Sequence, residues 1–120
     1  MSSFVSQEQQ ASPKIVVLNH REENSKTEIS LGSDSIQVMG RSQNSVGINF
    51  LMECDTTAFA VDFKSAYENP ESMERGERGG DGMTVIYTLT PKKKGTFTVY
   101  TVVNYRGREE SRTKHLITVK

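Results

Sequence analysis

Two alternating runs decide the fold: MTVIYTLT at residues 83–90 and TFTVYTVVNY at residues 96–105, joined by the short basic loop PKKKG at residues 91–95. In the first run, Met83, Val85, Tyr87 and Leu89 share one face and threonines occupy most of the other. The second run alternates in the same way. A period of two that is rich in Val, Thr, Tyr and Phe predicts antiparallel strands with one buried face.

Shorter runs extend this pattern along the rest of the chain, at residues 14–18, 28–31, 35–39, 46–52, 57–63 and 115–119. Segments rich in Gly, Asn, Asp and Pro separate them. About seven short strands in one domain predict an all-β fold, an immunoglobulin-like antiparallel β-sandwich. A scaffold of this kind usually works through its loops, so the loops are where function is expected.

Composition limits the classes of partner. The chain has 120 residues, enough for one domain, which we place at residues 13–120 after a polar tail (1–12) expected to be disordered. Fifteen basic and fifteen acidic residues cancel, so no nucleic-acid partner is predicted. No apolar run approaches the roughly 20 residues of a membrane-spanning helix, which predicts no membrane insertion.

Cys54 is the only cysteine, so no internal disulfide forms within one chain. Neither His20 nor His115 is expected to activate it, and a small buried hydrophobic role is predicted for it. Two histidines and one distant cysteine match no zinc-site spacing. The sequence therefore predicts no enzyme, metal or cofactor. Without a signal-peptide pattern, an intracellular protein and an exported one whose leader has been removed both remain open.

Residues 64–82 lack strand alternation, contain Pro70 and end in a glycine-rich stretch. Long irregular segments in compact domains are often functional, although a solvated connection with one helical turn near residues 71–75 is the alternative. In an immunoglobulin-type topology this segment would share one end of the sandwich with two other loops. The three loops are residues 40–47, 75–82 and 106–111.

The order and spacing of these loops resemble the chagasin-like cysteine-peptidase inhibitors over residues 28–120. In that family an Asn-Pro-Thr-Thr-Gly loop enters the cleft of papain-like peptidases, flanked by a Gly-x-Gly-Gly loop and an Arg-Pro-Trp loop. The chain matches the first motif at Asn44 and Gly47, and the third at Arg106. The second is approximated by three glycines, Gly79, Gly80 and Gly82.

The chain also departs from these motifs. Ser45 and Val46 replace Pro-Thr-Thr, Gly107 and Arg108 follow Arg106, and the chain contains no tryptophan. The resemblance implies a papain-like cysteine peptidase as partner and a non-catalytic inhibitory role. The alternative is a structural or adhesive immunoglobulin-like module without inhibitory activity, which would self-associate along an exposed sheet edge. The implied partner-binding residues are Asn44, Ser45, Val46, Gly47, Gly79, Gly80, Gly82, Arg106, Gly107 and Arg108.

Overall fold

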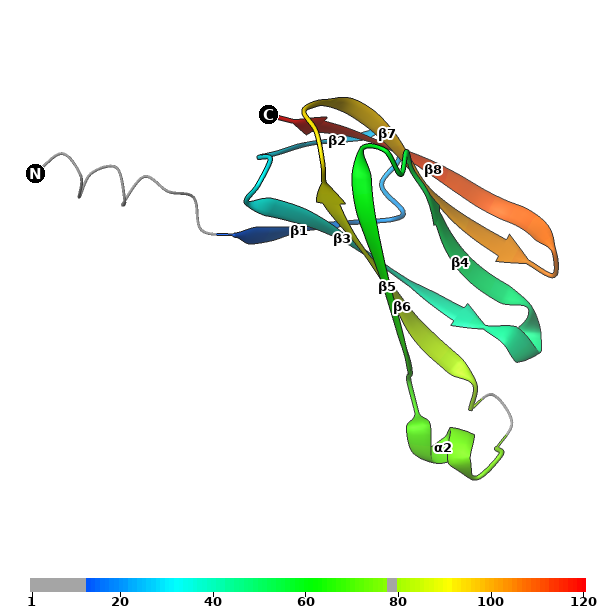
Figure 1. The fold of residues 1–120 in the computed structure, drawn as a ribbon. Helices are drawn as coiled ribbons and strands as arrows, with labels where there is room; N and C mark the ends of the chain where they lie inside the picture. The colour runs from blue at the N-terminus through cyan, green and yellow to red at the C-terminus, as the bar shows by residue number, and fades with distance from the viewer. Residues whose placement is uncertain (1–12, 78–79) are drawn as a thin grey trace, which may run out of the picture.

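The computed structural model describes residues 13–77 and 80–120 (Figure 1). The prediction of a disordered tail at residues 1–12 lies outside the described residues. The elements are β1 (Lys14–Leu18), β2 (Ser25–Ile29), β3 (Asp34–Gln43), the 3₁₀ turn η1 (Asn44–Val46), β4 (Ile48–Glu53), β5 (Phe59–Tyr67), α2 (Pro70–Glu74), β6 (Gly82–Pro91), β7 (Gly95–Tyr105) and β8 (Arg108–Val119).

The strands form two layers that meet at one corner (Figure 1). Hydrogen-bonded neighbours follow the order β2-β8-β7-β4-β3-β6-β5, and β1 pairs with β3. Strands β3 and β4 pair through one residue pair, Gln43 opposite Ile48. The sheet turns at this point, so that β2-β8-β7-β4 faces β1-β3-β6-β5. The all-β sandwich predicted from the sequence is confirmed.

Alternating side chains from both layers fill the space between them. Aromatic contacts cross it: the ring centroids of Phe59 and Phe97 are 5.5 Å apart, and those of Phe50 and Tyr87 are 6.1 Å apart. Each fully buried Val, Leu, Ile or Phe side chain contributes roughly 1.5–3 kcal/mol of transfer free energy. The buried cluster contains Leu18, Ile29, Ile36, Val38, Phe50, Ala58, Phe59, Val85, Leu89, Val99, Ile117 and Val119.

The pairing pattern differs from the expected one in two places. Strand β1 pairs parallel with β3, and β2 pairs parallel with β8. The first two strands thus cover the edges of opposite layers, because the chain crosses between the layers at residues 19–24. The described residues contain eight strands rather than about seven, and the sheet is mixed rather than wholly antiparallel.

Several strands are longer than their apolar runs. Residues 40–43, expected in a loop, belong to β3, residues 64–67 continue β5, and β8 begins at Arg108. The expected helical turn is confirmed as α2. The side chain of Asn69 caps α2 by accepting a hydrogen bond from the Ser72 N–H at 3.2 Å, and Pro70 occupies the first turn. No helix in the described part of the chain is long and apolar enough to cross a membrane.

Candidate functional site

The first loop is the tight turn η1 between β3 and β4. The N–H of Gly47 donates to the carbonyl of Asn44 at 3.0 Å and closes the turn. Gly47 has φ +76°, a left-handed conformation that L-residues rarely adopt. The side chains of Asn44, Ser45 and Val46 are exposed, so the turn presents them to solvent from a closed backbone.

The third loop is a two-residue hairpin turn, since Tyr105 at the end of β7 pairs with Arg108 at the start of β8. Its central residues are Arg106 (φ +51°) and Gly107 (φ +81°). Two positive φ values in a two-residue hairpin are the signature of a type I′ turn, whose twist matches that of the strands. Arg106 is an uncommon residue there, because a side chain in the left-handed region costs roughly 1–2 kcal/mol.

The first and third loops are joined directly. The N–H of Arg106 donates to the carbonyl of Gly47 at 2.8 Å. A Cβ added to Gly47 would lie 3.0 Å from Arg106 Cγ and 3.2 Å from its backbone N and Cα. Gly47 is therefore required for its conformation and for the close approach of the two backbones. This contact holds Arg106 in its unusual conformation beside η1.

The second loop reaches the first through Asp81. Its carboxylate accepts hydrogen bonds from the N–H and the hydroxyl of Ser45, both at 2.7 Å, and from Gln43 Nε2 at 3.3 Å. The Ser45 hydrogen bonds hold the pKa of the Asp81 carboxyl below its usual range, because they stabilise the charged form. The ionised carboxylate ties together segments 36 residues apart in sequence.

A second polar link supports the same end of the sandwich. Arg41 Nε donates to Glu68 Oε1 at 2.9 Å, and its Nη2 donates to Gln43 Oε1 at 2.7 Å. Arg41 lies on β3, and Glu68 directly follows β5, at the start of the β5–β6 connection that contains α2 and the second loop. Exposed ion pairs contribute little stability, but this one adds another fixed contact between β3 and the root of the loop.

The glycines expected in the second loop play a different part from the exposed turn residues. Gly80 and Gly82 are buried, and Gly79 lies outside the described residues. A Cβ on Gly80 would lie 2.9 Å from the Ser72 backbone, and one on Gly82 would lie 2.6 Å from Glu68 Oε1. Gly80 allows the loop to pack closely on α2, and Gly82 leaves room for the ends of the Glu68 and Arg41 side chains, so neither glycine presents a surface.

The structure adds two residues that the sequence reasoning did not single out. Asp81 is the acceptor that fixes η1, and its position within the glycine-rich stretch was the only local signal for it. Tyr105 is 39% exposed, and the Arg106 guanidinium carbon lies 5.2 Å from the centre of its ring. Val46 is 38% exposed. Together, Tyr105 and Val46 give the loop end of the sandwich an apolar surface, although the chain lacks the tryptophan of the Arg-Pro-Trp motif.

In the part of the chain that the structure describes, Cys54 forms no hydrogen bond with His20 or His115. Both ring nitrogens of buried His115 are held by hydroxyls, Ser25 at 2.7 Å and Thr101 at 3.0 Å. Burial and, second, the neighbouring Asp55 raise the pKa of the Cys54 thiol, which suppresses the reactive thiolate. Among the described residues, no group of three His, Cys, Asp or Glu side chains could hold a metal ion.

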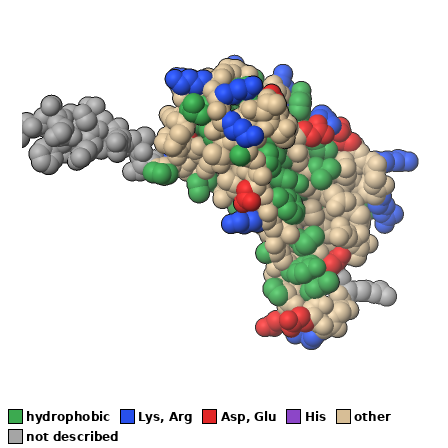
Figure 2. Space-filling model, viewed as in Figure 1, with side chains coloured by type: hydrophobic (Ala, Val, Ile, Leu, Met, Phe, Trp, Pro, Cys, Tyr) green, Lys and Arg blue, Asp and Glu red, His purple; other side chains and the backbone are tan. Residues whose placement is uncertain are grey.

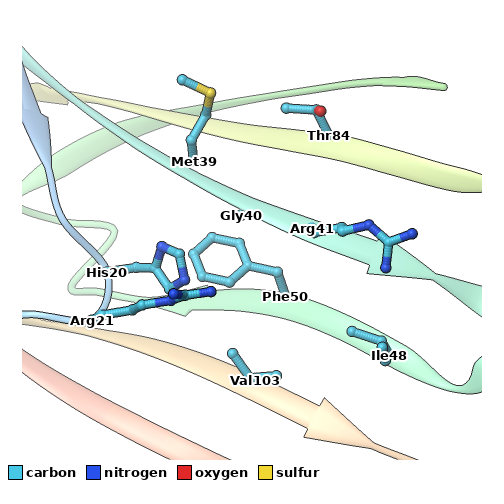
Figure 3. A pocket seen from close by; sticks show the side chains of 9 residues that line it. All are labelled: His20, Arg21, Met39, Gly40, Arg41, Ile48, Phe50, Thr84 and Val103. Carbon is cyan, nitrogen blue, oxygen red and sulfur yellow. The ribbon is translucent and has the colours of Figure 1, made fainter. Parts of the chain in front are cut away.

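A pocket of about 430 Å³ lies between β3 and β4 (Figure 3). Inside it the Phe50 ring covers Gly40, and His20 meets Phe50 edge-on at 5.0 Å between ring centroids. Burial, and then the charge of Arg21, lower the pKa of His20, which favours the neutral ring. The Phe50–Gly40 contact packs β3 against β4 at the root of η1. The lining residues are His20, Arg21, Met39, Gly40, Arg41, Ile48, Phe50, Thr84 and Val103.

Comparison with solved structures identifies the fold. The chain is similar to the cysteine protease inhibitor EhICP2 of Entamoeba histolytica, with a TM-score of 0.74 and 21% identity over 92% of this chain and 100% of that one. It is also similar to Amebosin, with a TM-score of 0.57 and 10% identity over the same shares. No protein-family model and no curated protein sequence matches the chain. These likenesses show that the chain has the chagasin-like fold expected from its loops.

Proposed function

We propose that this protein is a non-catalytic inhibitor of papain-type cysteine peptidases that acts through the three loops at one end of its sandwich. One observation carries the proposal: the first loop is hydrogen-bonded to both of the others, through Gly47 to Arg106 and through Ser45 to Asp81. The likeness in fold to a solved cysteine protease inhibitor supports the same function.

The physical argument is preorganisation. Binding loses affinity when flexible loops must be ordered, and η1 is already closed by its own hydrogen bond and by Asp81. A standard interface covers roughly 800 Å² on each partner, an area within reach of three adjacent loops. The Ser45 N–H is engaged by Asp81, which holds the exposed turn in a fixed shape that resists rearrangement in a peptidase cleft.

The missing tryptophan is the main difference from the family motifs. Aromatic and arginine side chains dominate most interface energies. In this chain Tyr105 and Arg106 supply both kinds of group at adjacent positions, with the cation over the ring. We assign them the anchoring role on the third loop, beside Asn44 and Val46 on the first.

Inhibition assays test the proposal. The full chain is titrated against papain and a cathepsin-type peptidase, with a serine peptidase as the specificity control. We expect inhibition confined to the cysteine peptidases, and Asn44→Ala and Arg106→Ala to raise the inhibition constant at least about tenfold. Lys94→Ala is the matched surface control, since Lys94 is exposed in the loop at the opposite end of β7.

Thermal melts of the same variants separate binding from folding. Asn44 is exposed, and alanine at position 106 keeps the backbone hydrogen bond to Gly47 while losing the exposed contact of the guanidinium with Tyr105. Both variants should therefore melt close to the unmodified chain. Absence of inhibition at micromolar protein, with a normal melt, would contradict the proposal and favour the structural module.

A further inference from the structure

Strand β5 is an open edge of its layer, paired with β6 on one side and ending the strand order on the other. Figure 2 shows hydrophobic side chains along the middle of this face, over β5 and β6. Phe63 is 53% exposed, Tyr67 42% and Val61 41%. A nine-residue open edge with exposed apolar side chains is a template for pairing with another strand.

The hydrogen bonds to β6 determine which backbone groups the open edge presents. The Lys92 N–H donates to the Ala58 carbonyl, and the Glu68 N–H donates to the Gly82 carbonyl. In an antiparallel ladder the direction of these groups alternates along the strand, so even-numbered residues of β5 face β6. The N–H and C=O groups of Val61, Phe63 and Ser65 therefore point to the open side.

We propose that β5 pairs antiparallel with β5 of a second copy, about a two-fold axis at Phe63. In this register Phe63 faces Phe63 of the second copy, and Val61 faces Ser65. These are the residues whose backbone groups point outward, so the ladder is hydrogen-bonded throughout. A symmetric pair of identical edges is the interface expected of a two-fold dimer.

The charged side chains of β5 favour this register. With Phe63 on the axis, Asp62 lies opposite Lys64 of the second copy, and the pair occurs twice by symmetry. Both occupy non-hydrogen-bonded positions, where facing side chains are closest. Sliding one copy by two residues preserves the hydrogen-bond polarity, but it places Asp62 against Asp62 or Lys64 against Lys64. The charges thus favour one self-pairing and oppose its nearest alternatives.

The dimer leaves the three-loop site of each copy free. Tyr67 ends β5 and leads through α2 toward the second loop, whereas Phe59 begins β5 at the opposite end of the strand. Because the paired strands run in opposite directions, the loops of the two copies lie at opposite ends of the joined sheet. The inference therefore does not depend on the inhibitory function, and loss of the dimer should leave inhibition per chain unchanged.

Charge reversal tests the pairing by sedimentation equilibrium of the full chain from about 1 µM to about 1 mM. We expect a monomer–dimer equilibrium for the unmodified chain. Asp62→Lys and Lys64→Asp should each raise the dissociation constant at least about tenfold. Mixed in equal amounts, the two variants should associate again, since each position 62 then meets an opposite charge at position 64.

Hydrogen exchange tests the register independently. As the protein concentration rises and the dimer forms, the amides of Val61, Phe63 and Ser65 should gain protection from exchange. The protection of the Asp62 and Lys64 amides should stay unchanged, because these amides are already hydrogen-bonded to β6. A monomer throughout the concentration range would overturn the proposal. The proposal would also be overturned if both charge variants still dimerised like the unmodified chain, or if the amides that gain protection lay on another edge strand such as β1.

Discussion

Replacing Gly47 with alanine tests whether the first and third loops form one unit. Gly107 is the matched control, because the two glycines have similar backbone conformations, φ +76° and φ +81°. Alanine in the left-handed region costs roughly 1–2 kcal/mol at either position. Only Gly47 has a neighbour in the way: nothing lies within 4 Å of a Cβ at Gly107, whereas Arg106 lies within 3.0–3.2 Å of one at Gly47.

The extra cost at Gly47 follows from what Arg106 can do. Its Cγ can move aside, but its backbone N and Cα are held by the hydrogen bond to the Gly47 carbonyl. Overpacking against a fixed neighbour costs about 1–3 kcal/mol. We therefore expect Gly107→Ala to lower the free energy of unfolding by about 1–2 kcal/mol and Gly47→Ala by about 2–5 kcal/mol.

Urea titration with the midpoint and slope fitted together is the measurement, since an unchanged slope shows that only stability has moved. Adding Arg106→Ala to Gly47→Ala removes the Cγ contact but leaves the backbone contacts, so it should recover only part of the loss. Equal losses for Gly47→Ala and Gly107→Ala would refute the reasoning. That result would mean that the two loops are not in close contact.

Two substitutions and one labelling experiment test other parts of the structure. Asp81→Asn should lower the free energy of unfolding at neutral pH, because the pKa of Asp81 is lower in the folded chain than in the unfolded one. The stability that Asp81 contributes is therefore fully present above its unfolded-state pKa of about 3.9, and it is lost as the pH falls through its folded-state pKa. Melts of both proteins should therefore converge at acid pH, and a gap independent of pH would count against the Ser45 contact. Gly40→Ala should cost about 3 kcal/mol or more in a denaturant titration, because its Cβ would lie 2.2–2.4 Å from the Phe50 ring; a cost near that of an exposed substitution would show that the ring is not held there. Cys54 should react with a thiol reagent at neutral pH much more slowly in the folded chain than in urea, since burial raises its pKa, and equal rates would contradict that environment.

The strands most visible in the sequence were placed well. Residues 83–90 and 96–105 fall within β6 and β7, because side-chain alternation is a local property that the chain carries in its order of residues. Helix α2 was also predictable, since Pro70 and a capping residue are local signals. The ends of β3 and β5 and the start of β8 were not, because residues 40–43, 64–67 and 108–114 lack a clear apolar alternation and are held in their strands by backbone pairing.

The sequence alone determined the all-β class, the approximate strands and the three candidate loops, because periodicity and turn residues depend on near neighbours. Only the tertiary structure decided that β1 and β2 pair in parallel, that His115 is buried between two hydroxyls, and that β5 is an open edge. It also decided the links from Ser45 to Asp81 and from Gly47 to Arg106. These contacts join residues far apart in the chain, and no local pattern specifies which distant backbone a turn will meet.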